Sequence, residues 1–134
     1  MVYDFCEIQM SLHVLVVEDE AIVRKDLILT LSRLGYQVAG EVSSAEEAVA
    51  LMGKVKIDLI LLDIKLRGET DGYQLAQRVN ALSPACGIII MSAYTPSRRK
   101  HLPPNVIGYL AKPFDATTLA STLESAKESL KALR

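Results

Sequence analysis

The stretch IDLILLD, residues 57–63, contains four consecutive large aliphatic residues and ends in a carboxylate. An apolar run without polar alternation is typical of a strand buried on both faces, as the strands of parallel sheets are. We therefore predict a strand over 57–62, with Asp63 directly after it. Open α/β sheets bind their ligands outside the carboxyl ends of the strands, so Asp63 lies where a functional residue is expected.

Similar apolar runs lie on both sides of this stretch, at residues 12–17, 36–42, 87–91 and 106–110. The segments between the runs carry apolar residues at helical spacing, so strand and helix alternate along the chain. This alternation predicts one α/β domain with a parallel sheet, helices on both faces and right-handed crossovers. We place the domain at residues 12–134 and treat residues 1–11 as an N-terminal extension.

Helix boundaries are marked by capping residues. We predict a helix over 21–34 that ends at Gly35, with an apolar stripe of Ile22, Val23, Leu27, Leu31 and Leu34. Further helices are expected after Ser44, which forms a capping box with Glu47, after Asp71 and after Asp115. The segment 95–104 contains three prolines, so we expect at most a short helical turn there.

The bulk composition is that of an ordinary globular domain. Half of the residues are hydrophobic and 23% are charged, and the net charge is -1. A chain without a strong field of either sign is not expected to bind nucleic acid directly. The first ten residues, MVYDFCEIQM, lack the basic region of a secretory signal, and no run reaches the roughly 20 apolar residues that span a bilayer. We expect a cytoplasmic protein.

Five polar residues follow the predicted strands and would meet at one edge of the sheet: Glu18, Asp19, Asp63, Ser92 and Lys112. Each alone is more typical of a helix cap, a turn or a solvated surface. Together, clustered carboxylates suit Mg²⁺, while the ammonium and the hydroxyl can stabilise phosphoryl oxygens. A carboxylate beside the metal is then a natural nucleophile, which would form an acyl phosphate.

Four motifs carry a family resemblance: VLVVEDE at 14–20, LILLDIKL at 59–66, IIIMSAY at 88–94 and GYLAKPF at 108–114. They resemble the response-regulator receiver domain of two-component signalling, over nearly the whole chain. The resemblance implies a flavodoxin-like, doubly wound, five-stranded parallel sheet of order 2-1-3-4-5, here with a shortened fourth helix.

The resemblance also implies roles for individual residues. Asp63 would accept the phosphoryl group, and Mg²⁺ would be bound by Glu18, Asp19, Asp63 and the backbone carbonyl of Lys65. Ser92 and Lys112 would contact the phosphoryl group, with Ser92 and Tyr109 acting as the switch pair. The Lys112–Pro113 bond would be cis.

As a receiver, the protein would be a phosphoacceptor switch rather than an enzyme, at most hydrolysing its own phosphoryl group. Its donor would be a sensor histidine kinase or a histidine phosphotransfer protein, as in a phosphorelay. Its signal would pass to a downstream protein or a fused output domain. The chain could also form a homodimer. Two alternatives remain at this point: a pseudo-receiver that binds partners without phosphorylation, and a phosphatase, which Lys65 disfavours because an acid is common at that position.

Lys65 and Arg67 depart from the common pattern in the loop after Asp63, which reads IKLRGETDG and is one residue longer than usual. We expect the Lys65 cation to alter the lifetime of the acyl phosphate, in a direction that the sequence does not determine. The shortened fourth helix puts the dimerisation mode usual in the family in doubt.

Overall fold

The computed structural model describes residues 12–66, 70–93 and 102–133. Within these ranges the strands are β1 (His13–Val17), β2 (Gln37–Val42), β3 (Leu59–Asp63), β4 (Gly87–Ser92) and β5 (Val106–Ala111). The helices are α2 (Ala21–Arg33), α3 (Ala45–Met52), α4 (Gly72–Leu82) and α5 (Ala116–Leu133). Among the described residues, none of the helices combines the length and apolar character needed to cross a membrane.

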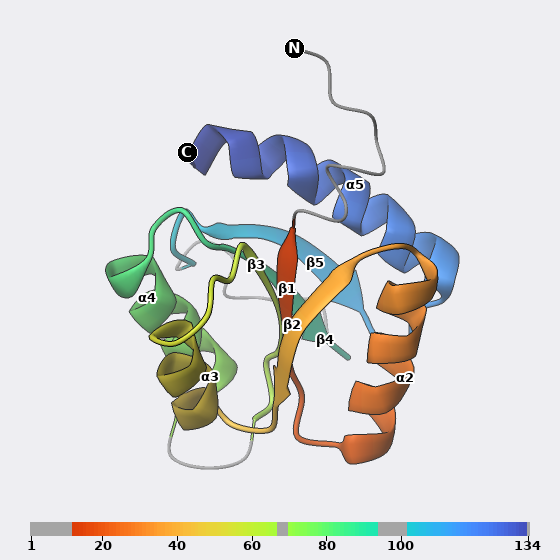
Figure 1. The fold of residues 1–134 in the computed structure, drawn as a ribbon, viewed down its shortest axis with the longest axis horizontal. Helices are drawn as coiled ribbons and strands as arrows, with labels where there is room; N and C mark the ends of the chain where they lie inside the picture. The colour runs from red at the N-terminus through yellow and green to blue at the C-terminus, as the bar shows by residue number, and fades with distance from the viewer. Residues whose placement is uncertain (1–11, 67–69, 94–101, 134) are drawn as a thin grey trace.

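The five strands form one parallel sheet in the order β2-β1-β3-β4-β5 (Figure 1). This order confirms the predicted doubly wound α/β fold. The sheet order reverses beside β1, because the chain first adds β2 on one side and then β3, β4 and β5 on the other. Residues at the carboxyl ends of β1 and β3 therefore lie next to each other at the switch point, where such folds bind ligands.

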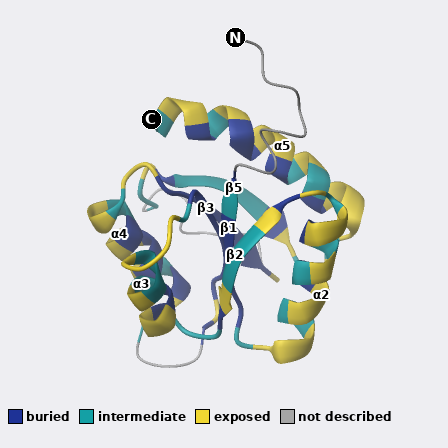
Figure 2. Cartoon of the chain, viewed as in Figure 1, coloured by how far each residue is buried: buried dark blue, intermediate teal, exposed yellow. Residues whose placement is uncertain are grey.

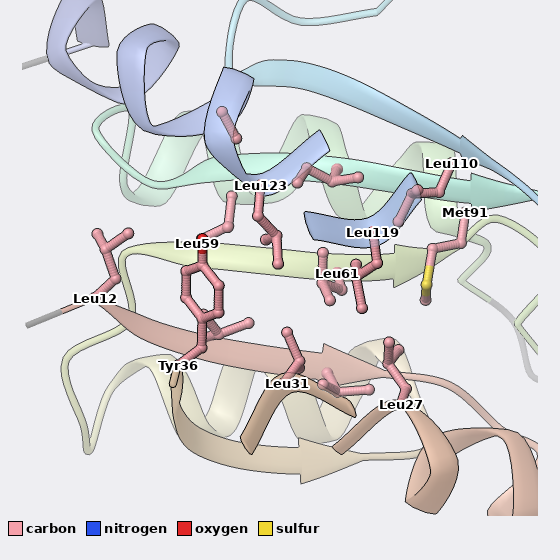
Figure 3. Close-up of a cluster of buried hydrophobic side chains, with 14 of the residues drawn as sticks. Leu12, Leu27, Leu31, Tyr36, Leu59, Leu61, Met91, Leu110, Leu119 and Leu123 are labelled. Atoms are coloured by element: carbon pink, nitrogen blue, oxygen red, sulfur yellow. The ribbon is translucent and has the colours of Figure 1, made fainter. Parts of the chain in front are cut away.

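Helices cover both faces of the sheet (Figures 1 and 2), which is why the central strands β1, β3 and β4 are apolar along most of their length. Leu59 and Leu61 point to the face covered by α2 and α5, where they pack with Leu27, Leu31 and Leu123 (Figure 3). The alternate residues of the same strand point to the face covered by α3 and α4. All five residues of β3 are buried, so the central strand is part of both hydrophobic clusters.

The end of α2 matches its prediction closely. Gly35 has a φ of 88°, a conformation that favours glycine. Its N–H donates to the Ser32 carbonyl at 3.1 Å, and the N–H of Tyr36 donates to the Leu31 carbonyl at 3.0 Å. This pair of hydrogen bonds is a Schellman motif, and the buried side chains of Leu31 and Tyr36 belong to the same hydrophobic cluster.

One side chain of the predicted stripe on α2 lies elsewhere. Ile22 is 86% exposed, whereas Leu27 and Leu31 are buried. Ile22 precedes Leu27 by five residues, which is about 140° around a helix, so it lies off the face that Leu27 and Leu31 share. The assignment of Ile22 to the buried stripe was therefore wrong.

The caps of the other helices show one further difference from prediction. Ser44 caps α3 by accepting the N–H of Glu47 at 3.2 Å, as expected. The Glu47 carboxylate accepts from the hydroxyls of Ser43 and Ser44 and not from the backbone of Ser44. A full capping box occurs instead at α4, between Asp71 and Gln74.

The strand ends also differ slightly from the predicted ones. β3 begins at Leu59 and not at Ile57, because Asp58 uses its side chain to accept the His13 N–H at 2.9 Å. It also includes Asp63, and β4 includes Ser92. The short turn predicted after Pro96 falls within residues 94–101, and the N-terminal extension 1–11 likewise lies outside the described residues. The predicted domain boundary stays a prediction.

Candidate functional site

Lys112 lies at the centre of a charged cluster at the carboxyl ends of the strands. Its Nζ lies 2.8 Å from Oε1 of Glu18 and 3.2 Å from Oδ2 of Asp63. Glu18 follows β1, Asp63 ends β3 and Lys112 follows β5, so the ammonium joins residues from three strands. Glu18 is completely buried and Asp63 is 6% exposed. The predicted convergence of these three side chains is therefore present.

Asp19 completes an acidic group with Glu18 and Asp63. One carboxylate oxygen from each lies within 4.8 Å of the others. Around Mg²⁺, with metal–oxygen distances of about 2.1 Å, ligand oxygens lie about 3 to 4 Å apart, so small side-chain rotations would bring the three into range. Oε2 of Glu18 is buried and has no hydrogen-bond partner in the described part of the chain, which leaves a lone pair for a cation. These residues fit Mg²⁺.

Burial alters the ionisation of the cluster. It raises the pKa of Glu18 from 4.5 to about 7, helped by a hydrogen bond with Asp63 and opposed by Lys112. Burial also acts against the charge on Lys112, but its hydrogen bond to Glu18 and the negative charge of Asp63 outweigh that effect and raise its pKa. Lys112 therefore remains an ammonium, and metal-free Glu18 takes up a proton near neutral pH.

The loop after β3 orients Asp63. The N–H of Lys65 donates to Oδ1 of Asp63 at 3.1 Å, while Lys112 pairs with Oδ2. Gly72 begins α4 directly against this loop, where an added Cβ would lie 2.7 Å from Cα of Ile64 and 2.8 Å from the Asp63 carbonyl oxygen. A glycine is therefore required there for α4 to pack against the loop. The role of the Lys65 carbonyl as a metal ligand stays a prediction.

Ser92 and Tyr109 lie on the two strands beyond Asp63. In the sheet register Asp63 pairs with Met91, and Ser92 pairs with Ala111, the residue before Lys112. Ser92 is buried and its carbonyl accepts the Lys112 N–H at 2.8 Å. Tyr109 is half-buried and packs against the cluster under α3 and α4. The Lys112–Pro113 bond is cis, as the resemblance implied.

Two features of the site region were not predicted. A groove of about 710 Å³ lies between α2 and the segment joining β5 to α5, and Lys112, Ala93 and the exposed Ile22 are part of its wall. The second feature is Arg24, whose Nη1 donates to the Glu18 carbonyl at 2.8 Å. The five-residue spacing from Ile22 to Leu27, which puts Ile22 off the buried face of α2, could have indicated an exposed apolar residue beside the site. Nothing in the sequence pattern marked Arg24.

Comparison with known proteins agrees with this geometry. A family model described as the response regulator receiver domain matches residues 14–124. The chain belongs to this family. A receiver domain is a signalling switch rather than an enzyme in the ordinary sense, and the two-component assignment made from the motifs is confirmed.

Curated relatives of this receiver domain include the sensory transduction protein LytT of Bacillus subtilis, which is 32% identical over 118 residues. The transcriptional regulatory protein PdtaR of Mycobacterium tuberculosis is 32% identical over 115 residues. These alignments cover 87% and 84% of this chain, but only 48% and 55% of the relatives. The chain thus spans about half the length of the relatives that it matches.

Solved structures agree on the fold. The signal receiver domain of a modulated diguanylate cyclase from Desulfovibrio desulfuricans has a TM-score of 0.80 and 35% identity, with 91% of this chain and 98% of that chain covered. The receiver domain of a sensor histidine kinase from Pseudomonas aeruginosa has a TM-score of 0.74 and 28% identity, with 84% and 94% covered. That structure contains a magnesium ion coordinated in the active site cleft.

Proposed function

We propose that this receiver domain accepts a phosphoryl group on Asp63 from a phosphohistidine of a sensor histidine kinase or a histidine phosphotransfer protein, in a Mg²⁺-dependent reaction. One observation carries the proposal: the Asp63 carboxylate lies 3.2 Å from the Lys112 ammonium, and one of its oxygens lies within 4.8 Å of carboxylate oxygens of both Glu18 and Asp19. A nucleophile, a cation for phosphoryl oxygens and a set of metal ligands thus share one edge of the sheet.

The reaction exchanges one bond for another. A carboxylate oxygen of Asp63 forms a bond to phosphorus while the phosphorus–nitrogen bond of the donor breaks, and the imidazole leaves with the electron pair and regains a proton from water. Lys112 neutralises charge on a phosphoryl oxygen, and the Ser92 hydroxyl donates to another. Mg²⁺, bound by Glu18, Asp19, Asp63 and the Lys65 carbonyl, would supply further charge neutralisation on the same oxygens.

Signal output follows from the charge that arrives on Asp63. New contacts from the phosphoryl group to Ser92 and Lys112 would favour one packing of the loops, with Tyr109 following Ser92. We propose that residues 12–134 act in this way in the cytoplasm, away from membrane and without direct contact to nucleic acid. The signal would pass to a downstream protein or a fused output domain, as the greater length of the relatives suggests.

The test is phosphoryl labelling by acetyl phosphate, followed by intact mass. We expect a single added phosphoryl group that requires Mg²⁺ and is released by hydroxylamine, because an acyl phosphate reacts with that nucleophile. Asp63→Asn removes the acceptor oxygen and abolishes the label. Asp58→Asn, directly before the start of β3, is the matched control and leaves labelling unchanged. Labelling that survives Asp63→Asn would refute the assignment.

A further inference from the structure

Arg24 makes two hydrogen bonds that join α2, the end of β1 and β2. Its Nη1 donates to the main-chain carbonyl of Glu18 at 2.8 Å, and its Nε donates to Oε1 of Glu41 at 3.3 Å. The Arg24 side chain is 17% exposed and the Glu41 side chain 44% exposed. A planar guanidinium can serve two acceptors in fixed directions, which a single ammonium cannot do as well.

These contacts restrain the peptide that carries the acidic pair. The N–H of Glu18 donates to the Val42 carbonyl at 3.1 Å, so β2 holds one side of the residue. Arg24 holds the other side through the Glu18 carbonyl, which belongs to the peptide bond between Glu18 and Asp19. Rotation of that peptide would move Asp19 relative to the buried Glu18 carboxylate. The Arg24 contact opposes this rotation.

We propose that Arg24 is a positioning residue for the magnesium site, with Glu41 orienting its guanidinium. The inference rests on the metal site of the proposed function. Within the described part of the chain, the hydrogen bonds of the Arg24 side chain go to Glu41 and to the Glu18 carbonyl and not to the three carboxylates, so Arg24 acts through the backbone between two of the ligands. Groups that orient metal ligands in this way commonly change metal affinity by about tenfold or more when they are removed.

Two effects of removing Arg24 oppose each other, so the sign of the change is informative. Loss of the guanidinium charge near an acidic cluster would strengthen cation binding. Loss of the hydrogen bond to the Glu18 carbonyl would weaken cation binding, because Glu18 and Asp19 are no longer held in fixed positions relative to each other. The Glu41 carboxylate already balances the guanidinium charge, so we expect the second effect to prevail.

The experiment measures Mg²⁺ affinity by isothermal titration calorimetry in the full chain. We expect Arg24→Ala to raise the dissociation constant about tenfold, Arg24→Lys to raise it less, and Glu41→Gln to raise it two- to threefold. Arg33→Ala, an exposed arginine on the same helix, is the matched control and leaves affinity unchanged. Circular dichroism of each variant verifies folding, and Arg24→Lys, which keeps the positive charge, keeps the test valid if Arg24→Ala does not fold.

Labelling by acetyl phosphate separates positioning from chemistry. At saturating Mg²⁺ we expect the Arg24→Ala protein to reach the wild-type rate, because only the metal affinity is impaired. Unchanged or tighter Mg²⁺ binding in folded Arg24→Ala, or unchanged binding in Glu41→Gln, would overturn the proposal. Wild-type protein that binds Mg²⁺ but takes up no phosphoryl group would contradict the proposed function, while the affinity comparison would still decide the role of Arg24.

Discussion

Glu18 combines complete burial with an acidic side chain, and Lys112, the ion-pair partner of its carboxylate, is shared with Asp63. Its folded-state pKa of about 7 exceeds its usual value of 4.5. Between these two values the folded protein keeps a proton that the unfolded chain has released. The free energy of unfolding therefore falls as the pH rises through this window.

We predict that the metal-free protein loses stability as the pH rises from 4.5 to about 7, by on the order of 3 kcal/mol for a pKa shift of this size. Urea denaturation in the presence of a chelator at several pH values measures the effect. Glu18→Gln removes the ionisation, so the difference between the two proteins isolates its contribution. A wild-type curve that runs parallel to the Glu18→Gln curve would contradict the prediction.

The residues at the strand ends could be predicted because each apolar run in the sequence ends at a polar residue. Asp63 and Lys112 each follow such a run, and parallel strands bring these ends to one edge. Arg24 could not be predicted in this way, because its role depends on where a long side chain reaches across the turn after β1. Spacing along the chain does not carry that information.

The junction between β3 and α4 depends on close backbone approach. We predict that Gly72→Ala destabilises the protein by about 1 to 3 kcal/mol, because its Cβ would meet backbone atoms of Ile64 and Asp63 that cannot rotate away. Displacement of the loop would also slow labelling of Asp63. Chemical denaturation and the acetyl phosphate assay measure the two effects.

Gly53→Ala provides the matched control for this substitution. An added Cβ there would come no closer than 3.6 Å to its nearest neighbour, and the residue has an ordinary helical φ of -79°. We expect little change in stability or labelling. Equal effects of the two substitutions would show that close packing at Gly72 is not the cause.

The groove between α2 and the β5–α5 segment offers an apolar surface next to Lys112. We predict that the protein donor docks there, so that Ile22→Asp slows transfer from a phosphorylated histidine phosphotransfer protein at least about tenfold. Labelling by acetyl phosphate stays unchanged, because the small donor needs no docking surface. Val55→Asp, an exposed apolar residue outside this groove, is the control. Equal slowing with both donors would place the defect at Asp63 itself.

Helix ends followed from local chemistry where one residue decides the geometry. Gly35 ends α2 and Ser44 begins α3 as predicted, because each makes its contact within the adjoining turn. The start of β3 was misplaced by two residues, since Asp58 bonds to His13, which is 45 positions away in the chain. Contacts of that range depend on the assembled sheet and leave no local signal.

The whole domain is expected to respond to its metal. A ligand that binds only the folded state stabilises it by mass action, by about 2.7 kcal/mol at 100 times the dissociation constant. We predict a rise in melting temperature with Mg²⁺ that is reduced in Asp63→Asn. No response to Mg²⁺ in the wild-type protein would instead favour a constitutive interaction module that uses the fold without phosphorylation.

The fold as a whole was the most predictable level, because five separate apolar runs with helical segments between them admit few arrangements. The strand order came from the family resemblance and agrees with the observed sheet. The groove beside Lys112 was not predictable, since it arises where α2, β5 and α5 meet and no single segment encodes it.

Lys112 is one counter-ion for two acids at the carboxyl ends of different strands. Any reaction that adds negative charge to Asp63 draws this ammonium toward it and leaves the interior carboxylate of Glu18 in need of a proton or a cation. Phosphorylation of Asp63 would thus change proton uptake by Glu18, after β1. It would also change the electrostatic attraction that acts on Lys112, directly after the edge strand β5. The shared ammonium would thus link the charge on Asp63 to the protonation of Glu18.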